Sequence, residues 1–214
     1  MKTLLALASL IALAACGSGG PPPPDWKTDA VDLIGRYQKH ALMGENSLAE
    51  RYFQQAVAAT GGAGRVAETA RLWLVRCATR RAMLIDDACT EYAELAPLEP
   101  NAANQTYYHF VTLRWEAVAT AQLPSQHRDL VSAAAGKRHQ VLGSIEDPLA
   151  RLLDASLLVM RREADAATLA LAAETASAQG WRQPLLTYQG NTAEQARLVR
   201  RIQLVEQSFA PGDK

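Results

Sequence analysis

From Asp25 onward the chain carries almost no β-strand pattern, and this limits its possible folds more than any other feature. Helix-favouring Ala, Leu, Glu, Gln and Arg are abundant, and no alternation of β-branched and polar residues persists. Glycine and proline gather at breaks near residues 61–62, 97–100, 123–124, 143–148 and 180–184. Each segment between two breaks is long enough for one helix or a helical hairpin. We therefore expect an all-α fold.

The length and the charge of the chain narrow its functional class. It has 214 residues, with 22 Lys and Arg against 22 Asp and Glu, and an isoelectric point near 6.9. Nucleic-acid binders need a strongly basic face to displace counterions from phosphates, so this balance argues against a nucleic-acid partner. The balance also provides no polybasic attraction to anionic lipid. The length suits a single domain with one sizeable core.

Two stretches of the helical region share one spacing of small, aromatic and apolar residues. The first begins at Ala30 and the second at Thr69, and both continue with a small, an aromatic and an apolar or small residue at matching intervals. These residues are Ala49, Phe53 and Ala56 in the first stretch, and Ala88, Tyr92 and Leu95 in the second. The spacing resembles the tetratricopeptide repeat, a pair of antiparallel helices of about 34 residues. In that family the small residue of the second helix permits close approach to the first.

The resemblance to the repeat is imperfect. A proline closes the second helix in the family, and Pro100 matches it in the second stretch, but the first stretch has Gly61 there. Neither stretch has the Trp-Leu-Gly signature of the first helix. The two starts also lie further apart than one repeat, so extra residues must loop out near 61–64.

The rest of the chain predicts further hairpins. We expect turns of the first two hairpins at 43–47 and 84–86, a third hairpin from 107–121 and 125–140, and a fourth from 149–162 and 166–179. A final helix at 192–209 is capped by Asn191 or Thr192. The prediction is therefore an α-solenoid of antiparallel, tetratricopeptide-like hairpins with a C-terminal capping helix. An unrelated helical bundle of similar periodicity is the alternative.

The first residues of the chain are typical of an export signal. Lys2 supplies a positive start, residues 4–13 are apolar, and small residues lead to Cys16. The apolar stretch is too short to span a bilayer, which takes roughly 20 residues. The segment Leu13-Ala14-Ala15-Cys16 resembles the lipobox of bacterial lipoproteins. In that family the signal peptide is cut before the cysteine, which then receives a diacylglycerol and a further acyl chain such as palmitate. An ordinary secretory signal with an incidental cysteine is the alternative.

The lipoprotein resemblance implies a location and an organisation of the chain. Acylated Cys16 would hold the protein on the lipid bilayer without a second membrane element. In the family an Asp after that cysteine favours the inner membrane. Gly17 stands there, so we expect an outer-membrane lipoprotein that faces the periplasm. The predicted parts are a signal peptide at 1–15, the lipidated cysteine and a Gly, Ser and Pro tether at 16–25, a helical-repeat domain at 26–210 and a tail at 211–214.

The two remaining cysteines predict a disulfide. Cys77 and Cys89 form an even pair in a chain that would fold in an oxidising periplasm. They lie equally far from position 83, beside the turn expected at Leu84–Asp86, and such residues of a hairpin face each other. A bridge would add about 3 kcal/mol in the chain-entropy model. Two separate buried thiols are the alternative, and the absence of Cys-x-x-Cys spacing disfavours a redox-active pair.

The sequence contains no recognisable catalytic or metal-binding pattern. The histidines His40, His109, His127 and His139 are scattered, and none has the His-Glu-x-x-His or Glu-x-x-His spacing of helical metal sites. A nucleophile elbow and a phosphate-binding loop are also missing. Glu116 could act as a lone general acid, but a single helical Glu is nearly always a solvated side chain. We therefore expect no enzyme, no cofactor and no metal.

Adjacent arginines and four tryptophans are the candidate surface residues. The pairs Arg80-Arg81, Arg161-Arg162 and Arg200-Arg201 lie late in predicted helices, where cations complement the helix dipole; alternatively, some bind an acidic partner or a glycan. Trp73 and Trp115 follow the apolar periodicity and are expected in the core. Trp26 and Trp181 are the expected exposed anchors for a partner, because exposed tryptophans are favoured binding hot spots.

These observations predict a membrane-anchored periplasmic scaffold or adaptor that binds another envelope protein through a helical-repeat groove. Lipoproteins with tetratricopeptide-like bodies, which this chain resembles, include pilotins and accessories of envelope assembly. The alternative is a periplasmic lipoprotein that binds a glycan or a small ligand. A deep pocket with convergent polar groups would favour that alternative, and a broad open groove would favour the scaffold.

Overall fold

The computed structural model of the protein describes residues 23–190, and within that range the chain is helical without a β-strand. This confirms the predicted all-α fold class. The α-helices are α1 (Asp25–Met43), α2 (Asn46–Gly62), α3 (Val66–Ala82), α4 (Thr90–Leu95), α5 (Ala102–Val111), α6 (Ser125–Ser132), α7 (Pro148–Met160) and α8 (Ala166–Ala178). The 3₁₀ helices are η1 (Trp115–Ala117), η2 (Thr120–Gln122) and η3 (Ala135–Ser144), and residues 182–190 are also helical. The predicted signal peptide, Cys16 and the helix at 192–209 lie outside the described residues.

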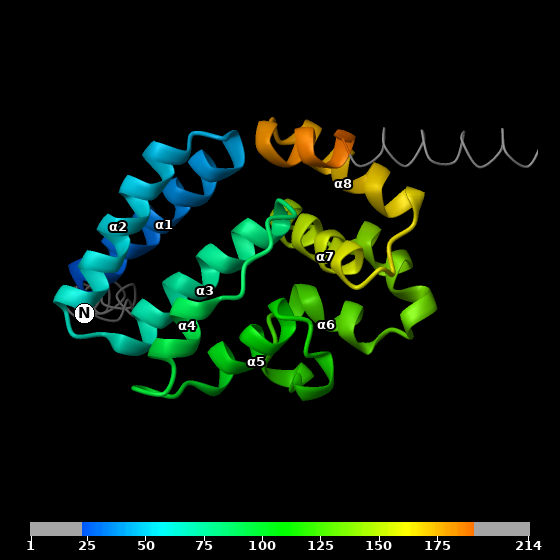
Figure 1. The fold of residues 1–214 in the computed structure, drawn as a ribbon. Helices are drawn as coiled ribbons and strands as arrows, with labels where there is room; N and C mark the ends of the chain where they lie inside the picture. Colours follow the sequence, from blue (N-terminus) through cyan, green and yellow to red (C-terminus); the bar gives the residue numbers. More distant parts are fainter. Residues whose placement is uncertain (1–22, 191–214) are drawn as a thin grey trace, which may run out of the picture.

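Helices α1 and α2 form a long antiparallel hairpin along one side of the molecule (Figure 1). Their facing sides carry Tyr37 and Phe53, whose ring centroids lie 5.2 Å apart. Phe53 is fully buried and also meets the Trp73 ring edge-on at 4.7 Å. The first predicted hairpin and its turn therefore agree with the structure.

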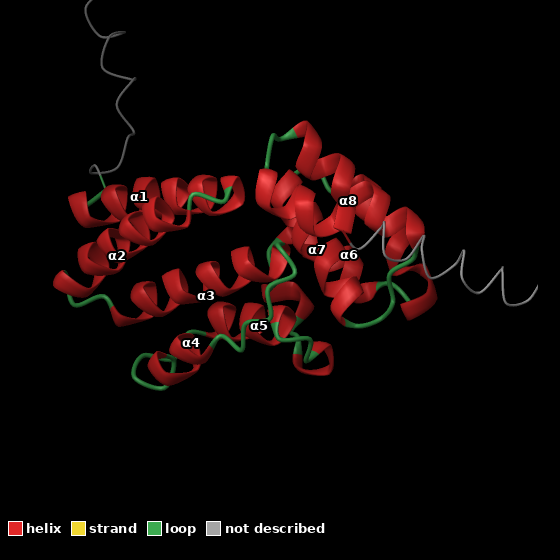
Figure 2. Cartoon of the chain, turned by 45° about the horizontal axis from the view of Figure 1, so that its top comes forward, coloured by secondary structure: helices red, strands yellow, loops and turns green. Residues whose placement is uncertain are grey.

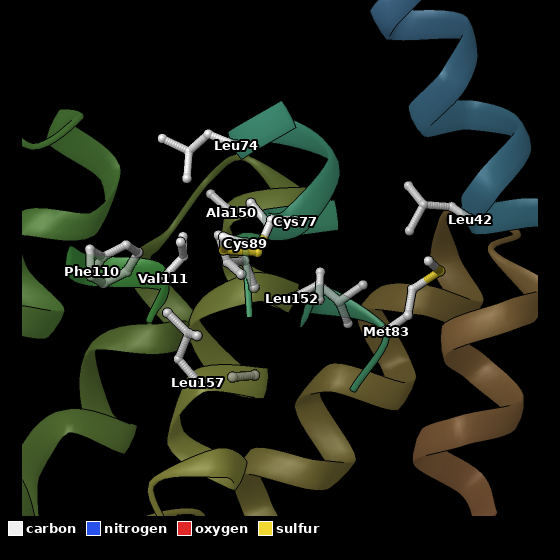
Figure 3. Close-up of a cluster of buried hydrophobic side chains, with 14 of the residues drawn as sticks. Leu42, Leu74, Cys77, Met83, Cys89, Phe110, Val111, Ala150, Leu152 and Leu157 are labelled. Atoms are coloured by element: carbon white, nitrogen blue, oxygen red, sulfur yellow. A yellow bond between two sulfur atoms is a disulfide. The ribbon is translucent and has the colours of Figure 1, made fainter. Parts of the chain in front are cut away.

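Helices α3 and α7 form the centre of the fold. α3 packs against α1 and α2, against α4 and α5, and against α7, which in turn packs against α8 (Figure 2). Apolar side chains from both central helices surround the bridge between Cys77 and Cys89, among them Leu74, Ala150 and Leu152 (Figure 3). One continuous apolar core therefore joins the N-terminal hairpin to the C-terminal helices.

One hydrogen-bond motif ends α1, α2, α3, α5, α7 and α8. A residue in the left-handed conformation follows each helix, and its own amide and the amide of the next residue donate back to the last turn. After α8, for example, Gly180 has φ 67°, and the Trp181 amide donates to the Ala176 carbonyl at 2.9 Å. Glycine occupies the left-handed position after α1, α2 and α8, whereas the position after α3, α5 and α7 holds Leu84, Leu113 and Arg162.

The second predicted hairpin is only partly present. α3 begins at Val66, and the helix expected to return along it, α4, has 6 residues and ends at Leu95, just before Pro97. Residues 83–89 form a loop rather than a tight turn. Ala88, the small residue expected to permit close helix packing, is exposed in that loop. The prediction failed because it assigned to a helix residues that lie in an extended loop.

The third predicted hairpin is wrong. α5 ends at Val111, 3₁₀ turns follow, and α6 ends at Ser132 before η3. Side chains hold this irregular backbone: the Trp115 indole donates to the Phe110 carbonyl at 2.8 Å, and Arg128 donates to the Leu123 and Ala121 carbonyls at 2.8 and 3.0 Å. These bonds satisfy carbonyls that a continuous helix would have paired itself.

The fourth predicted hairpin is confirmed by α7 and α8. Asp165 begins α8 with a capping box, in which its carboxylate accepts from the Thr168 amide at 2.7 Å. The helical residues 182–190 then return to the central helices. The buried Tyr188 hydroxyl donates to the Ala82 carbonyl of α3 at 3.3 Å and approaches the Leu152 carbonyl of α7 at 3.5 Å. This contact fastens the last described helix to the core.

The structure contains the predicted disulfide between Cys77 and Cys89, with their Cα atoms 5.3 Å apart. Cys77 lies on α3, but Cys89 lies in the loop before α4 rather than on a facing helix. The pairing therefore agrees with the structure, and the hairpin geometry used to predict it does not. The bridge ties the loop at 83–89 to the central helix.

Candidate functional site

A histidine and an aspartate from different helices form a buried pair. His127 Nδ1 on α6 lies 2.6 Å from Asp154 Oδ1 on α7, and the two residues are 2% and 0% exposed. Apolar rings surround the histidine, with the Phe110 centroid at 4.8 Å and the Tyr107 centroid at 5.8 Å. Polar groups so deeply buried require a partner, and each supplies one to the other.

The aspartate of this pair has an unusual charge balance. Burial raises the pKa of the Asp154 carboxyl to about 6, although the hydrogen bond and the positive charge of His127 favour its ionised form. Its second oxygen, Oδ2, is buried without a hydrogen-bond partner among the described residues. Desolvation also raises the pKa of the neighbouring Tyr107 phenol far above its ordinary value. The pair therefore sits where water is largely excluded.

Two hollows meet at this histidine. The first, of about 520 Å³, lies between α3 and the segment that runs from α5 to α6. The second, of about 250 Å³, lies between α3, α6 and the start of α7. Val75, Tyr107, Gln126 and His127 line both hollows. We call the two hollows together the α3 groove.

The α3 groove has a mixed lining. Leu74 and Val75 of α3 with Leu149 and Leu153 of α7 provide apolar surface. Charged and amide groups lie beside them: Glu68, Arg71, Glu99, Asn101, Asn104, Gln122 and Gln126 in the first hollow, and Gln38 and Asp147 in the second. The groove is thus suited to bind a molecule that has both apolar and polar parts.

The groove lacks the groups of the common nucleophilic mechanisms. Ser, Thr and Cys are absent from the lining of the first hollow. Thr79, in the second, donates its hydroxyl to the Val75 carbonyl at 2.8 Å. The His127–Asp154 pair can therefore accept, donate or hold a proton, but the described lining offers it no serine, no cysteine and no free threonine hydroxyl to activate.

The described residues contain one group that resembles a metal site, formed by Cys77, Asp87 and Cys89. Both sulfurs belong to the disulfide, so they are not thiolate ligands. His40 is paired with Glu45 at 2.5 Å. The His109 ring lies 5.9 Å from the Tyr108 ring, and its Nδ1 is buried without a hydrogen-bond partner among the described residues.

The predicted anchor tryptophans lie apart from the groove. Trp26, at the start of α1, is half-buried and has the Arg65 guanidinium 5.2 Å above its ring. Trp181 is half-buried against the apolar core. Trp115 is buried as predicted, whereas Trp73 is only partly so. Neither predicted anchor lines the α3 groove.

The arginine pairs at residues 80–81 and 161–162 have mainly structural contacts. Arg81 is 7% exposed and donates to the Asp87 and Val111 carbonyls at 2.9 and 2.8 Å. Arg161 lies 4.3 Å from the Trp115 ring centre and pairs with Glu163 at 2.7 Å. Arg200 and Arg201 lie outside the described residues.

The His127–Asp154 pair could not be predicted from the sequence, because 27 residues separate its members along the chain. Spacing rules find ligands on one helix or one loop, and they do not connect α6 to α7. One signal was present: Asp154 is the only charged residue between Leu152 and Met160, in an otherwise largely apolar helix. An acid at such a position predicts a buried polar partner.

Comparison of the chain with protein-family models, with curated proteins and with solved structures gives no match. Across the described residues, no helix has both the length and the apolar character that a bilayer span needs. The groove and the N-terminal sequence are therefore the two features of the chain that bear on its function.

Proposed function

We propose that this protein is an outer-membrane lipoprotein, anchored through acylated Cys16 and facing the periplasm, that acts as a scaffold or adaptor for another envelope protein. The α3 groove is the observation that carries the proposal. Its two hollows share Tyr107 and His127 in their linings, and together they offer apolar and amide groups. Such a surface suits an extended segment of a partner chain.

The N-terminal sequence supports the anchor in this proposal. Leu13-Ala14-Ala15-Cys16 resembles a lipobox, and the Gly, Ser and Pro residues up to Pro24 would hold the body away from the bilayer. In the structure α1 begins at Asp25, directly after the prolines. The tether would therefore lead straight into the folded body.

We propose further that the body is a tetratricopeptide-like α-solenoid. The hairpin α1–α2 supports this, because Ala49 and Ala56 of α2 are buried at 3% and 0% exposure, as small residues of the repeat are where its helices approach closely. The hairpin α7–α8 would be a second unit. The short α4 and the irregular segment after α5 depart from the repeat, and the segment after α5 forms one wall of the α3 groove.

Site-specific photocrosslinking in the native host tests the adaptor function. A photoreactive residue at Gln126, which is exposed and lines the groove, should capture one envelope protein. The same residue at Arg51, which is exposed on α2 and lines neither hollow, is the matched control. Capture should be lost in the Cys16→Ser chain if the anchor places the body beside its partner. Equal capture from both positions would contradict the proposal.

The alternative is a periplasmic lipoprotein that binds a glycan or a small ligand. The convergence of His127, Tyr107 and several amide groups in one hollow favours it. Absence of a protein crosslink at Gln126, together with retention of the folded chain on isolated peptidoglycan, would support this alternative.

A further inference from the structure

The floor of the α3 groove carries polar atoms that the protein leaves unused. Asp154 occupies Nδ1 of His127, and no described residue is hydrogen-bonded to Nε2, although the side chain is only 3% exposed and lines both hollows. The Tyr107 hydroxyl beside it likewise has no hydrogen-bond partner among residues 23–190. A buried polar atom that faces a hollow without a protein partner is a place where a ligand can bond.

The protonation state of the pair decides whether Nε2 donates or accepts a hydrogen bond. If Asp154 is protonated, its hydroxyl donates to Nδ1 and the ring hydrogen lies on Nε2. If Asp154 is ionised beside an imidazolium, both ring nitrogens carry hydrogen. If Asp154 is ionised beside a neutral ring, Nδ1 carries the hydrogen and Nε2 is an acceptor. A carboxylate can only accept at Nε2, so it would bind to the first two arrangements, which present an N–H to the groove. Tyr107 supplies an O–H close by.

The charged side chains around the first hollow add a cation to these donors. Arg71 of α3 is exposed on the lining and forms no ion pair with any described residue. Each of the two carboxylates of the same hollow has one oxygen engaged: Glu68 pairs with Arg65 at 2.9 Å, and Glu99 accepts from the Ala67 amide at 3.1 Å. The other oxygen of Glu68, Oε2, is buried without a hydrogen-bond partner among the described residues. Beside side-chain amides such as those of Gln122 and Gln126, the side-chain hydrogen-bond donors without a partner in this hollow are therefore a guanidinium, a phenol and an imidazole.

We propose that Arg71, Tyr107 and His127 form a binding site for a carboxylate group of the ligand in the α3 groove. A planar carboxylate accepts several hydrogen bonds at once, and its bonds to cationic donors are the strong ones. At about 520 Å³ the first hollow is much larger than a carboxylate, so the rest of the ligand lies along Leu74 and Val75. The carboxylate is either the C-terminus of a peptide or an acidic side chain. This inference rests on the proposed function only in that the groove is a binding surface.

Three acetylated tripeptides separate the two sources of the carboxylate. Acetyl-Ala-Ala-Ala with a free C-terminus, the same peptide as its amide, and the amide of acetyl-Ala-Glu-Ala are titrated into the isotope-labelled chain with the Cys16→Ser substitution. NMR follows the ring signals of His127. One acid should bind about tenfold more tightly than the neutral amide. A preference for the first identifies a C-terminus, and a preference for the third identifies a side chain. Equal affinity of all three, or no shift of the His127 ring with any, would overturn the proposal.

Variants of the two least buried groups test the site without disturbing the buried pair. Arg71→Gln should weaken binding of the preferred acid about tenfold, and Tyr107→Phe should weaken it several-fold, while neither changes binding of the neutral amide. Arg51→Gln removes an equal charge from an exposed position outside the groove and should leave binding unchanged. If Arg51→Gln weakened binding as much as Arg71→Gln, general electrostatic attraction would replace the proposed site.

The proposal and the adaptor function can fail separately. Peptide binding is an equilibrium measurement on the purified chain, whereas photocrosslinking at Gln126 reports a partner in the cell. Binding of the acid without any protein crosslink would support a site for small carboxylates and exclude the adaptor. A crosslink that survives Arg71→Gln, together with no preference for the acids, would support the adaptor and exclude the carboxylate site.

Discussion

The hairpin α1–α2 and the segment from residue 83 to residue 145 are stabilised in different ways. In the hairpin, two long helices satisfy their own backbone and pack through Tyr37, Phe53 and small residues of α2. In the segment, helices are short, and side chains of neighbouring elements bond its loop carbonyls. The arginines that do so are Arg81, Arg128, Arg151 and Arg161.

This difference shows where the irregular wall of the α3 groove obtains its rigidity. A loop whose carbonyls accept from a fixed guanidinium is held almost as a helix would be, although its backbone is free to depart from one. Arginine suits this role because its planar group presents several donors in fixed directions. The regular helices thus support the segment that forms the groove.

Removal of the Arg81 side chain should have the largest effect on stability of the changes that test this comparison. Arg81→Ala leaves the Asp87 and Val111 carbonyls without their donor inside the protein, and we expect a loss of about 4 kcal/mol of unfolding free energy. Arg80→Ala is the matched control, because Arg80 is 37% exposed and pairs with Asp87 at the surface. It should cost less than about 1 kcal/mol. Urea unfolding followed by circular dichroism measures both, and equal losses would contradict the assigned role of Arg81.

Removal of the disulfide should have the next largest effect. The double substitution Cys77→Ser and Cys89→Ser should lower the unfolding free energy by about 3 kcal/mol relative to a Cys16→Ser chain that keeps the bridge. Hydrogen exchange should show the loss of protection mainly in α4 and α5, with α1 and α2 little changed. A uniform loss across all helices would mean that the bridge supports the whole core rather than the irregular segment.

The sequence predicted the regular helices well and the irregular segment poorly, for one physical reason. Apolar periodicity and glycine breaks locate α1, α2, α7 and α8, because Gly44 follows α1, α2 ends at Gly62, and α7 and α8 lie between clear breaks. Helices α3 and α5 are instead followed by Leu84 and Leu113 in the left-handed conformation, which nothing in the residue type indicates. The prediction therefore continued a helix past Val111, through residues that turn away.

The candidate site was hidden from the sequence for a related reason. The disulfide could be predicted because both cysteines lie near one turn and the compartment is oxidising. The contact between His127 and Asp154 depends on how α6 crosses α7, and that crossing follows from the irregular segment. Arg71, Tyr107 and His127 lie on three different helices, so their convergence follows only from the tertiary packing.

The buried His127–Asp154 pair joins the irregular segment to α7. The free energy of unfolding should therefore depend on pH through the ionisation of Asp154. Because burial raises the pKa of Asp154 to about 6 from 3.8, the folded state binds a proton more readily than the unfolded state. Stability from this group is therefore present below pH 4 and is lost as the pH rises through 6. Relative to Asp154→Asn, which keeps the shape without the titration, the protein should lose about 2 kcal/mol between pH 4 and pH 6. Urea unfolding at several pH values measures this difference, and a gain of stability over that range would show that the ionised form is the favoured one.

The smallest predicted effect on stability concerns the residues that follow α7 and α8, the two helices of one hairpin. After α7, Arg162 has φ 59°, and the next amide, of Glu163, donates to the Leu158 carbonyl at 2.9 Å; after α8, Gly180 and Trp181 repeat this motif. The exposed Arg162 makes no side-chain hydrogen bond within the described residues, and a Cβ on Gly180 would meet open space. The effect of a substitution at position 162 or 180 on stability should therefore depend on the backbone conformation alone.

We therefore expect substitutions at these two positions to change stability in opposite directions. Arg162→Gly should raise the unfolding free energy by about 1 kcal/mol, because glycine adopts the left-handed conformation without steric cost. Gly180→Ala should lower it by about 1 kcal/mol, because alanine adopts that conformation only with strain. Thermal and urea unfolding of both variants test the pair. Destabilisation by both would show that the Arg162 side chain supports α7 through packing, as the other arginines support the irregular segment, and would extend that role to the regular hairpin.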